Sequence, residues 1–489
     1  MTINSYNTRL LKGDINLMFE NEKTSIIILT YNNLDYNRIC LESIRKYTTV
    51  GTYEIVIVDN KSTDGTREWL KEQSDIKLIL NDENVGFPKG CNLGIEASEK
   101  DNDILLLNND TKVTPRWLDN LKKCLYSYDK IGAVGSVTNN CSNYQTMNVP
   151  YSDIEDMIEF ANSNNISAPE KWEQKARLVG FCMLIKRDVI NKIGTLDERF
   201  TPGNFEDDDL CMRIIEAGYK LMLCNDSFIH HFGSTSFKKD YTKFNNVLRT
   251  NAQRFEEKWG FNSNYQSRLK FDVIERINEP KEKELNILEF DCGLASTLFR
   301  LKYMYPNAGL YGIETNKNIT KICEKMIEVM TEDFEEIYTM KFKESKINFF
   351  DYIILGNKLQ LSKDPWKLLK EIKKFLKPGG YIIATIPNIM HHSVIKGLLN
   401  GTFLYNQNSI LNRNYNKLFT LSDIHKIFDD CGYINPYVFH YYRETSQEDD
   451  KFLNQICSII GENMKGYFLS YEYVAKFQKD INDKDNNIL

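Results

Sequence analysis

The sequence has no long hydrophobic segment, no strong charge imbalance and no paired cysteine motif. No stretch approaches the roughly 18 consecutive apolar residues of a membrane-spanning helix. The first residues also lack a compact apolar signal core with a small-residue cleavage site. We therefore expect no transmembrane segment and a cytoplasmic location. The 62 Lys and Arg against 68 Asp and Glu leave a net charge of only −6, which argues against nucleic acid as a partner.

Cysteine usage argues against a disulfide scaffold. The 11 cysteines are odd in number and scattered without CxxC pairs, which favours reduced, mostly buried thiols. At 489 residues the chain is longer than one hydrophobic core usually serves, so we expect two domains and connecting helices. The sequence leaves the oligomeric state open.

Strand-like and helix-like segments alternate in both halves of the chain. The first half has apolar runs at residues 24–31, 53–60, 76–81 and 103–110, with helical stretches at 66–73 and 91–98. The second half repeats the pattern with LNILEFDCG, AGLYGIET, FDYIILGN and GGYIIATIPN. Such alternation predicts two open α/β sheets that bind ligands at the carboxyl ends of their strands.

Composition and charge then suggest domain boundaries. We expect an N-terminal extension over 1–22, a first α/β domain over 23–240 and a helical linker over 241–283. A second α/β domain would cover 284–443, and residues 444–489, which carry helix-like apolar spacing, would form a helical tail.

Three polar segments of the first half carry candidate site residues. Asp59 ends a strand in VDNKSTDGT, where a carboxylate can accept the imide N–H of uracil or thymine; Asx-rich turn chemistry is an equal alternative. NVGFPKGCN brings glycines, a lysine and an amide before a helix, which suits phosphate contact. In LLLNND a buried strand ends in Asn108, Asn109 and Asp110, where a divalent cation could bridge two phosphates. A polar turn is the alternative there.

A run of acids and a pair of histidines add to this set. One acid at a helix start gains about 0.3–1 kcal/mol from the helix dipole, but adjacent carboxylates repel one another. Capping alone therefore does not explain the run in FEDDDLCMR; a metal, an arginine or a deprotonation task would. His230 and His231 sit at a strand end, and alternation sends their rings to opposite faces, so only one can face a metal such as Mn²⁺ or Mg²⁺. The four acids are Glu206, Asp207, Asp208 and Asp209.

The first half resembles the family 2 glycosyltransferases of GT-A fold, the rhamnosyltransferase-like branch in particular. The resemblance covers roughly residues 23–240 and rests on SIIILTYN, VDNKSTDGT, NVGFPKGCN, LLLNND, GFCMLIKRDVI and FEDDDLCMR followed by HHFGS. It implies a nucleoside diphosphate sugar as donor, a divalent metal as cofactor, and inversion of the anomeric carbon in one displacement.

The resemblance also implies roles for individual residues. Asp207 would be the catalytic base, and Asp209 would support the acceptor side. Asp110 would be the principal metal ligand, since the DxD position begins with Asn108 here, and His231 fits the metal-ligand histidine better than His230. Asp59 would bind the base of the donor, and the other implied donor-binding residues are Thr30, Asn32, Asn84, Gly86, Lys89, Asn92 and Asn108.

The second half resembles the class I S-adenosylmethionine-dependent methyltransferases over roughly residues 285–442. Glu289 and Gly293 in ILEFDCGLAS match the cofactor loop, and Glu314 in YGIET matches the ribose-binding acid. Asp291 and Ala295 stand where the family usually has glycines, and Asp291 would oppose the carboxylate of the cofactor. We therefore expect a degenerate domain used for acceptor binding, packing or oligomerisation; a working methyltransferase is the alternative.

Three functions follow from these motifs. The leading hypothesis is an inverting glycosyltransferase that uses a UDP- or dTDP-sugar and acts on a surface glycan or a surface protein such as flagellin. The second is a bifunctional enzyme that also methylates the glycan. The third is a non-enzymatic scaffold that binds sugar nucleotides, which the intact carboxylates at Asp110 and Asp207 speak against.

Overall fold

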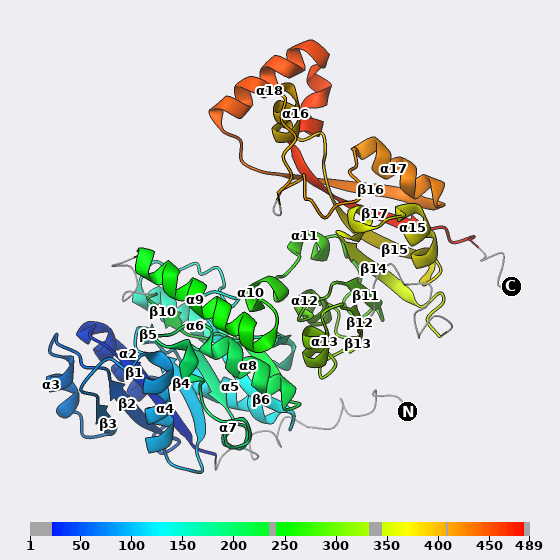
Figure 1. Cartoon of the computed structure of the whole chain (residues 1–489). Coiled ribbons are helices and arrows are strands. Elements are labelled where there is room, and N and C mark those ends of the chain that lie inside the picture. The colour runs from blue at the N-terminus through cyan, green and yellow to red at the C-terminus, as the bar shows by residue number, and fades with distance from the viewer. Residues whose placement is uncertain (1–21, 234–240, 332–344, 407–408, 484–489) are drawn as a thin grey trace. The chain divides into compact units, whose positions relative to one another are not determined.

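The computed structural model describes residues 22–233, 241–331, 345–406 and 409–483. They fall into two compact units, residues 1–267 and 268–489, and each has its own central sheet (Figure 1). The expected N-terminal extension lies almost wholly outside the described residues. Among the residues that are described, no helix combines the length and the apolar character needed to cross a bilayer.

The first unit contains an eight-stranded mixed sheet in the order β3-β2-β1-β4-β8-β6-β9-β7. Its strands are β1 (Thr24–Thr30), β2 (Tyr53–Asp59), β3 (Ile76–Leu80), β4 (Asp103–Asn108), β6 (Ile131–Val137), β7 (Trp172–Lys175), β8 (Cys182–Ile185) and β9 (Lys220–Phe228). A two-stranded ribbon pairs β5 (Thr111–Lys112) with β10 (His230–His231). Strands β1 to β4 are mutually parallel, so their polar ends gather at one edge.

Helices of the first unit connect these strands. They are α2 (Leu34–Tyr47), α3 (Thr66–Lys71), α4 (Phe87–Ala97), α5 (Trp117–Tyr126), α6 (Ile154–Asn164), α7 (Arg187–Ile193), α8 (Glu206–Glu216), α9 (Tyr241–Trp259) and α10 (Ser263–Gln266), with 3₁₀ turns η2 (Pro169–Lys171) and η3 (Glu198–Phe200). Apolar side chains of β1, β2 and β4 are fully buried, as their β-branched runs predict. The four strands and two helices expected here are confirmed.

The second unit contains a seven-stranded sheet in the order β13-β12-β11-β14-β15-β17-β16. Its strands are β11 (Asn286–Phe290), β12 (Gly309–Ile313), β13 (Glu328–Met330), β14 (Phe350–Gly356), β15 (Leu376–Pro387), β16 (Tyr433–Tyr442) and β17 (Ser470–Lys479). The five strands β11 to β15 are parallel and follow a Rossmann-like order. The predicted fold class, a GT-A-like α/β sheet followed by a Rossmann-like one, is confirmed.

Helices of the second unit complete its layers. They are α11 (Phe271–Ile274), α12 (Ser296–Met304), α13 (Lys317–Cys323), α14 (Lys358–Leu361), α15 (Pro365–Lys373), α16 (His392–Leu399), α17 (Leu421–Asp430), α18 (Gln447–Ile460) and α19 (Lys465–Leu469), with the 3₁₀ turn η5 (Glu462–Met464). One core packs α15 and α17 on the sheet.

Two expected boundaries were wrong. Residues 241–283 are not a separate linker, because α9 and α10 belong to the first unit and α11 to the second. Phe255 of α9 is fully buried and packs on Phe200 and Phe205 of the first unit. The tail is not wholly helical either, since β17 lies between β15 and β16 and is antiparallel to both. Its alternating pattern SYEYVAKFQK buries Tyr473, Ala475 and Phe477 in the core.

Candidate functional site

The first part of the candidate site is a carboxylate–imidazole pair. Asp110 lies two residues after the end of β4, and His231 ends β10. The ribbon sets His231 opposite Thr111, so its Nε2 lies 3.1 Å from Asp110 Oδ1. The other ring nitrogen, Nδ1, lies 2.7 Å from the carbonyl oxygen of Asn140, which fixes the ring orientation.

The Asp110–His231 pair is nearly buried, and this burial affects the pKa of the histidine. Burial lowers the pKa of His231, but the hydrogen bond to Asp110 and the charge of that carboxylate outweigh burial and raise the pKa above its ordinary value. His230 points elsewhere: its Nδ1 lies 2.7 Å from the Tyr151 hydroxyl, and burial lowers its pKa to about 4. The alternation expected along this strand therefore brings His231, not His230, to Asp110.

The second part is Asp207 in the first turn of α8. Its Oδ2 accepts a hydrogen bond from Gly180 N at 2.9 Å, and its Oδ1 accepts one from Asp208 N at 2.9 Å. Burial and the charge of Asp208 raise the pKa of Asp207 to about 6. A carboxylate that titrates this close to neutrality is suited to take up a proton.

Gly180 and Phe181 connect the two parts. The ring of Phe181 stacks on His231 with centroids 5.4 Å apart, and the carbonyl oxygen of Phe181 accepts the amide of Asn108 at 2.8 Å. A Cβ at Gly180 would lie 3.4 Å from Cβ of Asp207. The dipeptide Gly180–Phe181 thus holds Asp207 beside the end of β4, next to the Asp110–His231 pair.

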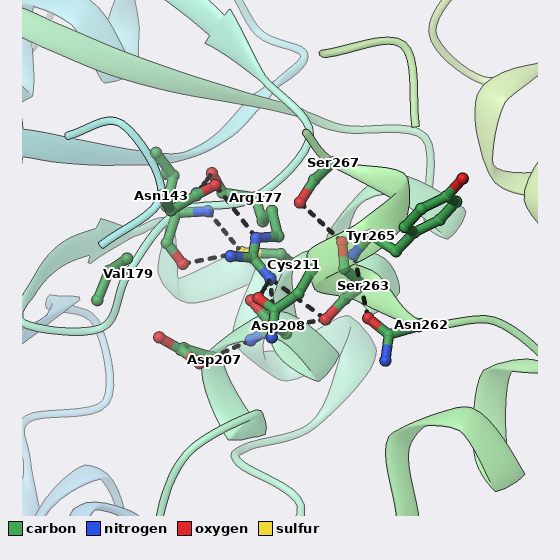
Figure 2. A network of polar contacts seen from close by, with 12 residues as sticks. Asn143, Arg177, Val179, Asp207, Asp208, Cys211, Asn262, Ser263, Tyr265 and Ser267 are labelled. Atoms are coloured by element: carbon green, nitrogen blue, oxygen red, sulfur yellow. Dashed lines mark hydrogen bonds and ion pairs between the residues drawn. The ribbon is translucent and has the colours of Figure 1, made fainter. Parts of the chain in front are cut away.

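Asp208 is held by an arginine rather than aimed at a ligand. Arg177 Nη1 lies 2.8 Å from Asp208 Oδ2, and Ser263 Oγ donates to the same oxygen at 2.7 Å. Figure 2 shows Arg177 at the centre of this network, where its Nε also donates to Asn143 Oδ1 at 3.2 Å. The arginine that could explain the acidic run is therefore present, and it neutralises the acid next to Asp207.

The remaining two acids of the run are also buried. Asp209 is fully buried and receives Arg213 Nε at 2.8 Å, Lys258 Nζ at 2.5 Å and Trp259 Nε1 at 2.9 Å. Its Oδ1 joins α8 to Lys258 and Trp259 of α9, and its Oδ2 pairs with Arg213 within α8. Support of the acceptor side by Asp209 stays a prediction. Burial raises the pKa of Glu206 well above its ordinary value.

The donor-side residues at the ends of β1 and β2 form a connected turn. The amide of Asn32 donates to Ser62 Oγ at 2.7 Å, and Asn32 Oδ1 accepts from the amide of Thr63 at 2.8 Å. Thr30 Oγ1 accepts from Asn109 Nδ2 at 3.2 Å. These contacts tie the β1 end to the turn after β2 and, through Asn109, to the end of β4.

Asp59 lies at the expected strand end but is fully covered. Arg67 Nε lies 3.2 Å from its Oδ2, and the amide of Ser62 donates to the same oxygen at 3.1 Å. Its Oδ1 has only a long contact of 3.4 Å with that amide. Contact with a nucleobase therefore requires the covering groups to move.

The Gly-rich loop packs closely before α4. Gly86 has φ +84°, and a Cβ there would meet Thr201 Cγ2 at 2.8 Å, so no other residue fits without a shift. Asn84 caps the loop through Oδ1 to the Gly86 amide at 3.0 Å. Lys89 is exposed.

The side chain of Asn92 is bonded to the backbone of Leu196. Its Nδ2 donates to Leu196 O at 2.9 Å, and its Oδ1 accepts the Leu196 amide at 2.9 Å. A donor contact by Asn92 stays a prediction.

In the second unit, the loop after β11 is surrounded by lysines. Lys270 Nζ lies 2.6 Å from Oε1 of the fully buried Glu289, and Lys358 forms an ion pair with Asp291. Burial raises the pKa of Glu289 although Lys270 acts against that rise. Lys358 thus offsets much of the expected repulsion between Asp291 and a cofactor carboxylate.

Glu314 lies beside this loop, as expected, but its oxygens are engaged. The amide of Gly293 donates to Oε2 at 3.1 Å, and the amide of Asn316 donates to Oε1 at 2.9 Å. Ala295 takes φ +60°, a left-handed conformation that an L side chain tolerates poorly. Glu289, Gly293 and Glu314 therefore gather around one loop.

Two family models match the chain, one on each unit. Residues 25–194 match glycosyl transferase family 2, and residues 281–432 match a methyltransferase domain. The chain joins a family 2 glycosyltransferase domain to a methyltransferase domain.

Similar proteins cover one domain each. Glycosyltransferase AglE of Haloferax volcanii is 26% identical over 211 residues, 41% of this chain and 64% of that protein. Demethylmenaquinone methyltransferase of a Geobacillus species is 26% identical over 161 residues, 32% of this chain and 61% of that protein. The chain thus spans less than two thirds of the length of either relative. A crystal structure of GalNAc-T7 with UDP, GalNAc and Mn²⁺ superposes with TM-score 0.39 at 16% identity, over 49% of this chain and 48% of that one.

Several contacts in the glycosyltransferase domain had no signal in the sequence. Arg177 meets the acidic run only after folding, and Asn109 was seen only as part of a polar strand end. Gly180 and Phe181 lie within GFCMLIKRDVI, one of the ordered motifs, so that motif was the one pointer to them.

Proposed function

We propose that the chain is an inverting, metal-dependent glycosyltransferase. It would move a sugar from a UDP- or dTDP-sugar onto a surface glycan or a surface protein such as flagellin. The observation that carries this proposal is the placement of Asp207, a carboxylate of raised pKa, on the amide of Gly180, whose neighbour Phe181 stacks on His231 of the Asp110–His231 pair. A scaffold that only binds sugar nucleotides has no use for a carboxylate tuned in this way.

Asp110 and His231 are suited to hold Mn²⁺ or Mg²⁺. The Asn140 carbonyl oxygen takes the Nδ1 proton of His231, so Nε2 faces the carboxylate of Asp110. Over the described ranges no group of three or more His, Cys, Asp and Glu side chains forms a metal site, which fits a cation held by few protein groups and by substrate phosphates. When bound, the cation would stabilise the negative charge of the departing diphosphate.

Residues of the chain carry the remaining steps of the reaction. Asp207 takes the proton of the acceptor hydroxyl, and that oxygen attacks the anomeric carbon from the face opposite the diphosphate. The amide of Gly180 keeps the carboxylate in place, and Arg177 compensates the Asp208 charge that would otherwise raise the pKa of the base further. On the donor side, the exposed Lys89 in the first turn of α4 would meet the phosphates, since the amides of Gly86 and Phe87 are already paired with Asn84 and Pro202.

We propose a degenerate role in acceptor binding or packing for the methyltransferase domain. Lys270 forms an ion pair with Glu289, and two backbone amides donate hydrogen bonds to Glu314. The two carboxylates expected to contact the cofactor therefore already have partners. Methylation of the glycan is the second candidate, favoured by the Lys358–Asp291 pair, because it removes the charge repulsion against the cofactor carboxylate.

Donor hydrolysis tests the main proposal. The purified chain is incubated with UDP-, dTDP- and GDP-sugars, with Mn²⁺ or with EDTA, and release of the nucleoside diphosphate is measured. We expect hydrolysis of at least one UDP- or dTDP-sugar that needs Mn²⁺ and is lost in Asp110→Ala. Metal-independent release that survives this substitution would refute the metal assignment.

A further inference from the structure

The second unit has an open groove away from its cofactor loop. The groove encloses about 790 Å³ and lies on the last three strands of the sheet and the segment after α11. Its aromatic lining consists of Tyr381 on β15 and Tyr437 and Phe439 on β16. Three side-chain amides, those of Asn278, Asn435 and Gln478, line it as well.

Strand register shows that the groove and the cofactor loop occupy opposite ends of the sheet. Tyr381 pairs with Tyr352 of β14, which pairs with Ile287 near the start of β11. The loop 291–295 follows the other end of β11. On its other side Tyr381 pairs with Gln478 of β17. The groove therefore lies toward the amino ends of the parallel strands, where Rossmann-like sheets do not place their cofactor.

Two of the three rings are covered by cations of the protein itself. The guanidinium of Arg276 lies 3.3 Å from the ring centroid of Phe439, and Lys476 Nζ lies 4.2 Å from that of Tyr381. Tyr437 is different: it is 56% exposed, and its ring meets Phe439 at an angle of 72°. Tyr437 thus presents an aromatic face supported from the side.

The polar lining is held in fixed positions. Asn435 Nδ2 donates to Gln478 Oε1 at 2.6 Å, and Gln478 Nε2 donates to Gly379 O at 2.9 Å. Lys476 Nζ donates to the carbonyl oxygen of Arg276 at 2.8 Å. These contacts leave Asn435 Oδ1 as an acceptor in the groove that Tyr437 also lines.

This chemistry matches a carbohydrate. A pyranose has one face of C–H groups that packs on an aromatic ring and a rim of hydroxyls that pair with amides. A purely apolar ligand would bury the acceptor Asn435 Oδ1 without giving it a donor, which costs affinity. The positive charge of Arg276 and Lys476 is partly offset by Glu275, which pairs with Arg276 at 2.9 Å, so a polyanion has little to gain.

We propose that this groove binds an oligosaccharide and holds the acceptor glycan for the glycosyltransferase domain. The second half of the statement rests on the proposed function, while the first half stands on the groove alone. The volume is within the range of small-ligand sites and leaves room for a few sugar residues.

Binding to the full-length chain is measured by saturation-transfer difference NMR and calorimetry. The probes are maltotetraose, chitotetraose, xylotetraose and tetragalacturonate. We expect at least one to bind, and Tyr437→Ala to weaken its binding about tenfold, because stacking on the ring is lost. Tyr437→Phe should keep most of the affinity. Tyr441→Ala is the matched control, since Tyr441 lies on the same strand and is 50% exposed but does not line the groove.

Two outcomes would overturn the proposal: failure of all four probes to bind, or binding that Tyr437→Ala leaves unchanged. If reduced, carboxymethylated α-lactalbumin bound in a Tyr437-dependent way and no saccharide did, the groove would be a polypeptide site. Donor hydrolysis is measured on the same variants. Saccharide binding without hydrolysis would refute the proposed enzyme but not the groove, and hydrolysis without saccharide binding would do the reverse.

Discussion

Two neighbouring carboxylates of α8 should respond in opposite ways to the same isosteric change. Asp207 has a pKa raised to about 6 by burial and by the charge of Asp208, whereas Asp208 is paired with Arg177 at 2.8 Å. Asp207→Asn removes an unfavourable charge, and Asp208→Asn leaves a buried arginine without its partner. The first change should leave the fold intact and stop the chemistry, and the second should weaken the fold.

The magnitudes follow from these contacts. A rise of about two pKa units corresponds to about 3 kcal/mol of destabilisation when the group is ionised, and partial exposure of Asp207 to solvent reduces this to about 1–2 kcal/mol. In Asp207→Asn the side-chain NH₂ would face one of the two backbone N–H groups that now donate to the carboxylate, and this lost hydrogen bond costs about 1 kcal/mol. We therefore expect Asp207→Asn to be neutral or stabilising by about 1 kcal/mol at pH 7.5. Asp208→Asn should lose about 3–5 kcal/mol, because the pair is buried.

The pH dependence has a definite sign. A raised carboxyl pKa means that the folded chain keeps a proton which the unfolded chain has lost, so ionisation of Asp207 costs stability as the pH rises through about 6. Below about pH 4 both states are protonated, and any gain from Asp207→Asn should vanish there.

The assay is urea denaturation followed by tryptophan fluorescence. Four of the five tryptophans lie in the first unit, so the signal reports mainly on the glycosyltransferase domain. In parallel, kcat of Asp207→Asn should fall about 10²- to 10⁴-fold with donor affinity nearly intact. A stability loss of about 3 kcal/mol or more in Asp207→Asn would refute the reasoning, since only a paired carboxylate costs that much. If Asp207→Asn kept its activity and Asp208→Asn lost it, the catalytic base would be Asp208 instead of Asp207.

Three further predictions follow from the two sites. Asp110→Ala should abolish metal-dependent turnover and weaken nucleotide binding, His231→Ala should act more mildly, and His230→Ala should be nearly silent; the reverse order in a turnover assay would place the metal on the other face of the strand. For the wild-type chain, kcat/KM should fall about tenfold per unit below pH 6, since the base must be ionised, and a flat profile from pH 5 to 8 would contradict this. Calorimetry should find weak or no S-adenosylmethionine binding. Asp291→Gly should improve it, most visibly at low salt, because a negative charge is removed while the positive charge of Lys358 stays, and Lys358→Ala should weaken it further, because only the charge of Asp291 is then left. Low-micromolar affinity of the wild type would instead support the bifunctional enzyme.

Much of the fold could be predicted because its signals are local. A buried parallel strand reads as an uninterrupted β-branched run, so β1, β2 and β4 were found within a residue or two of their ends. That only one of the two histidines faces Asp110 was also a local signal, because alternate residues of a strand face opposite sides; the choice of His231 rested on the family resemblance. The position of Asp110, which lies beside His231, followed from the predicted end of one strand.

The contacts that the sequence did not reveal join residues that are distant in the chain. Asp209 looks like its neighbours in FEDDDLCMR, and only the packing of α9 brings Lys258 and Trp259 to it. Asn92 lies in a loop motif, yet its side chain is bonded to Leu196, more than a hundred residues away. The tail was assigned as helical because its first part is; β17 gains its place only by pairing with β15 and β16.

The sequence by itself determined which segments are strands or helices and which acids and histidines reach the strand ends, since side-chain periodicity and polar strand termini are encoded locally. Only the tertiary structure decided which of the four acids stays available for chemistry. Asp207 keeps a raised pKa and only backbone amide donors, whereas Arg177 holds Asp208. The physical reason is that a carboxylate's charge state depends on its burial and on ion pairs between elements far apart in the chain, and no local pattern specifies those contacts.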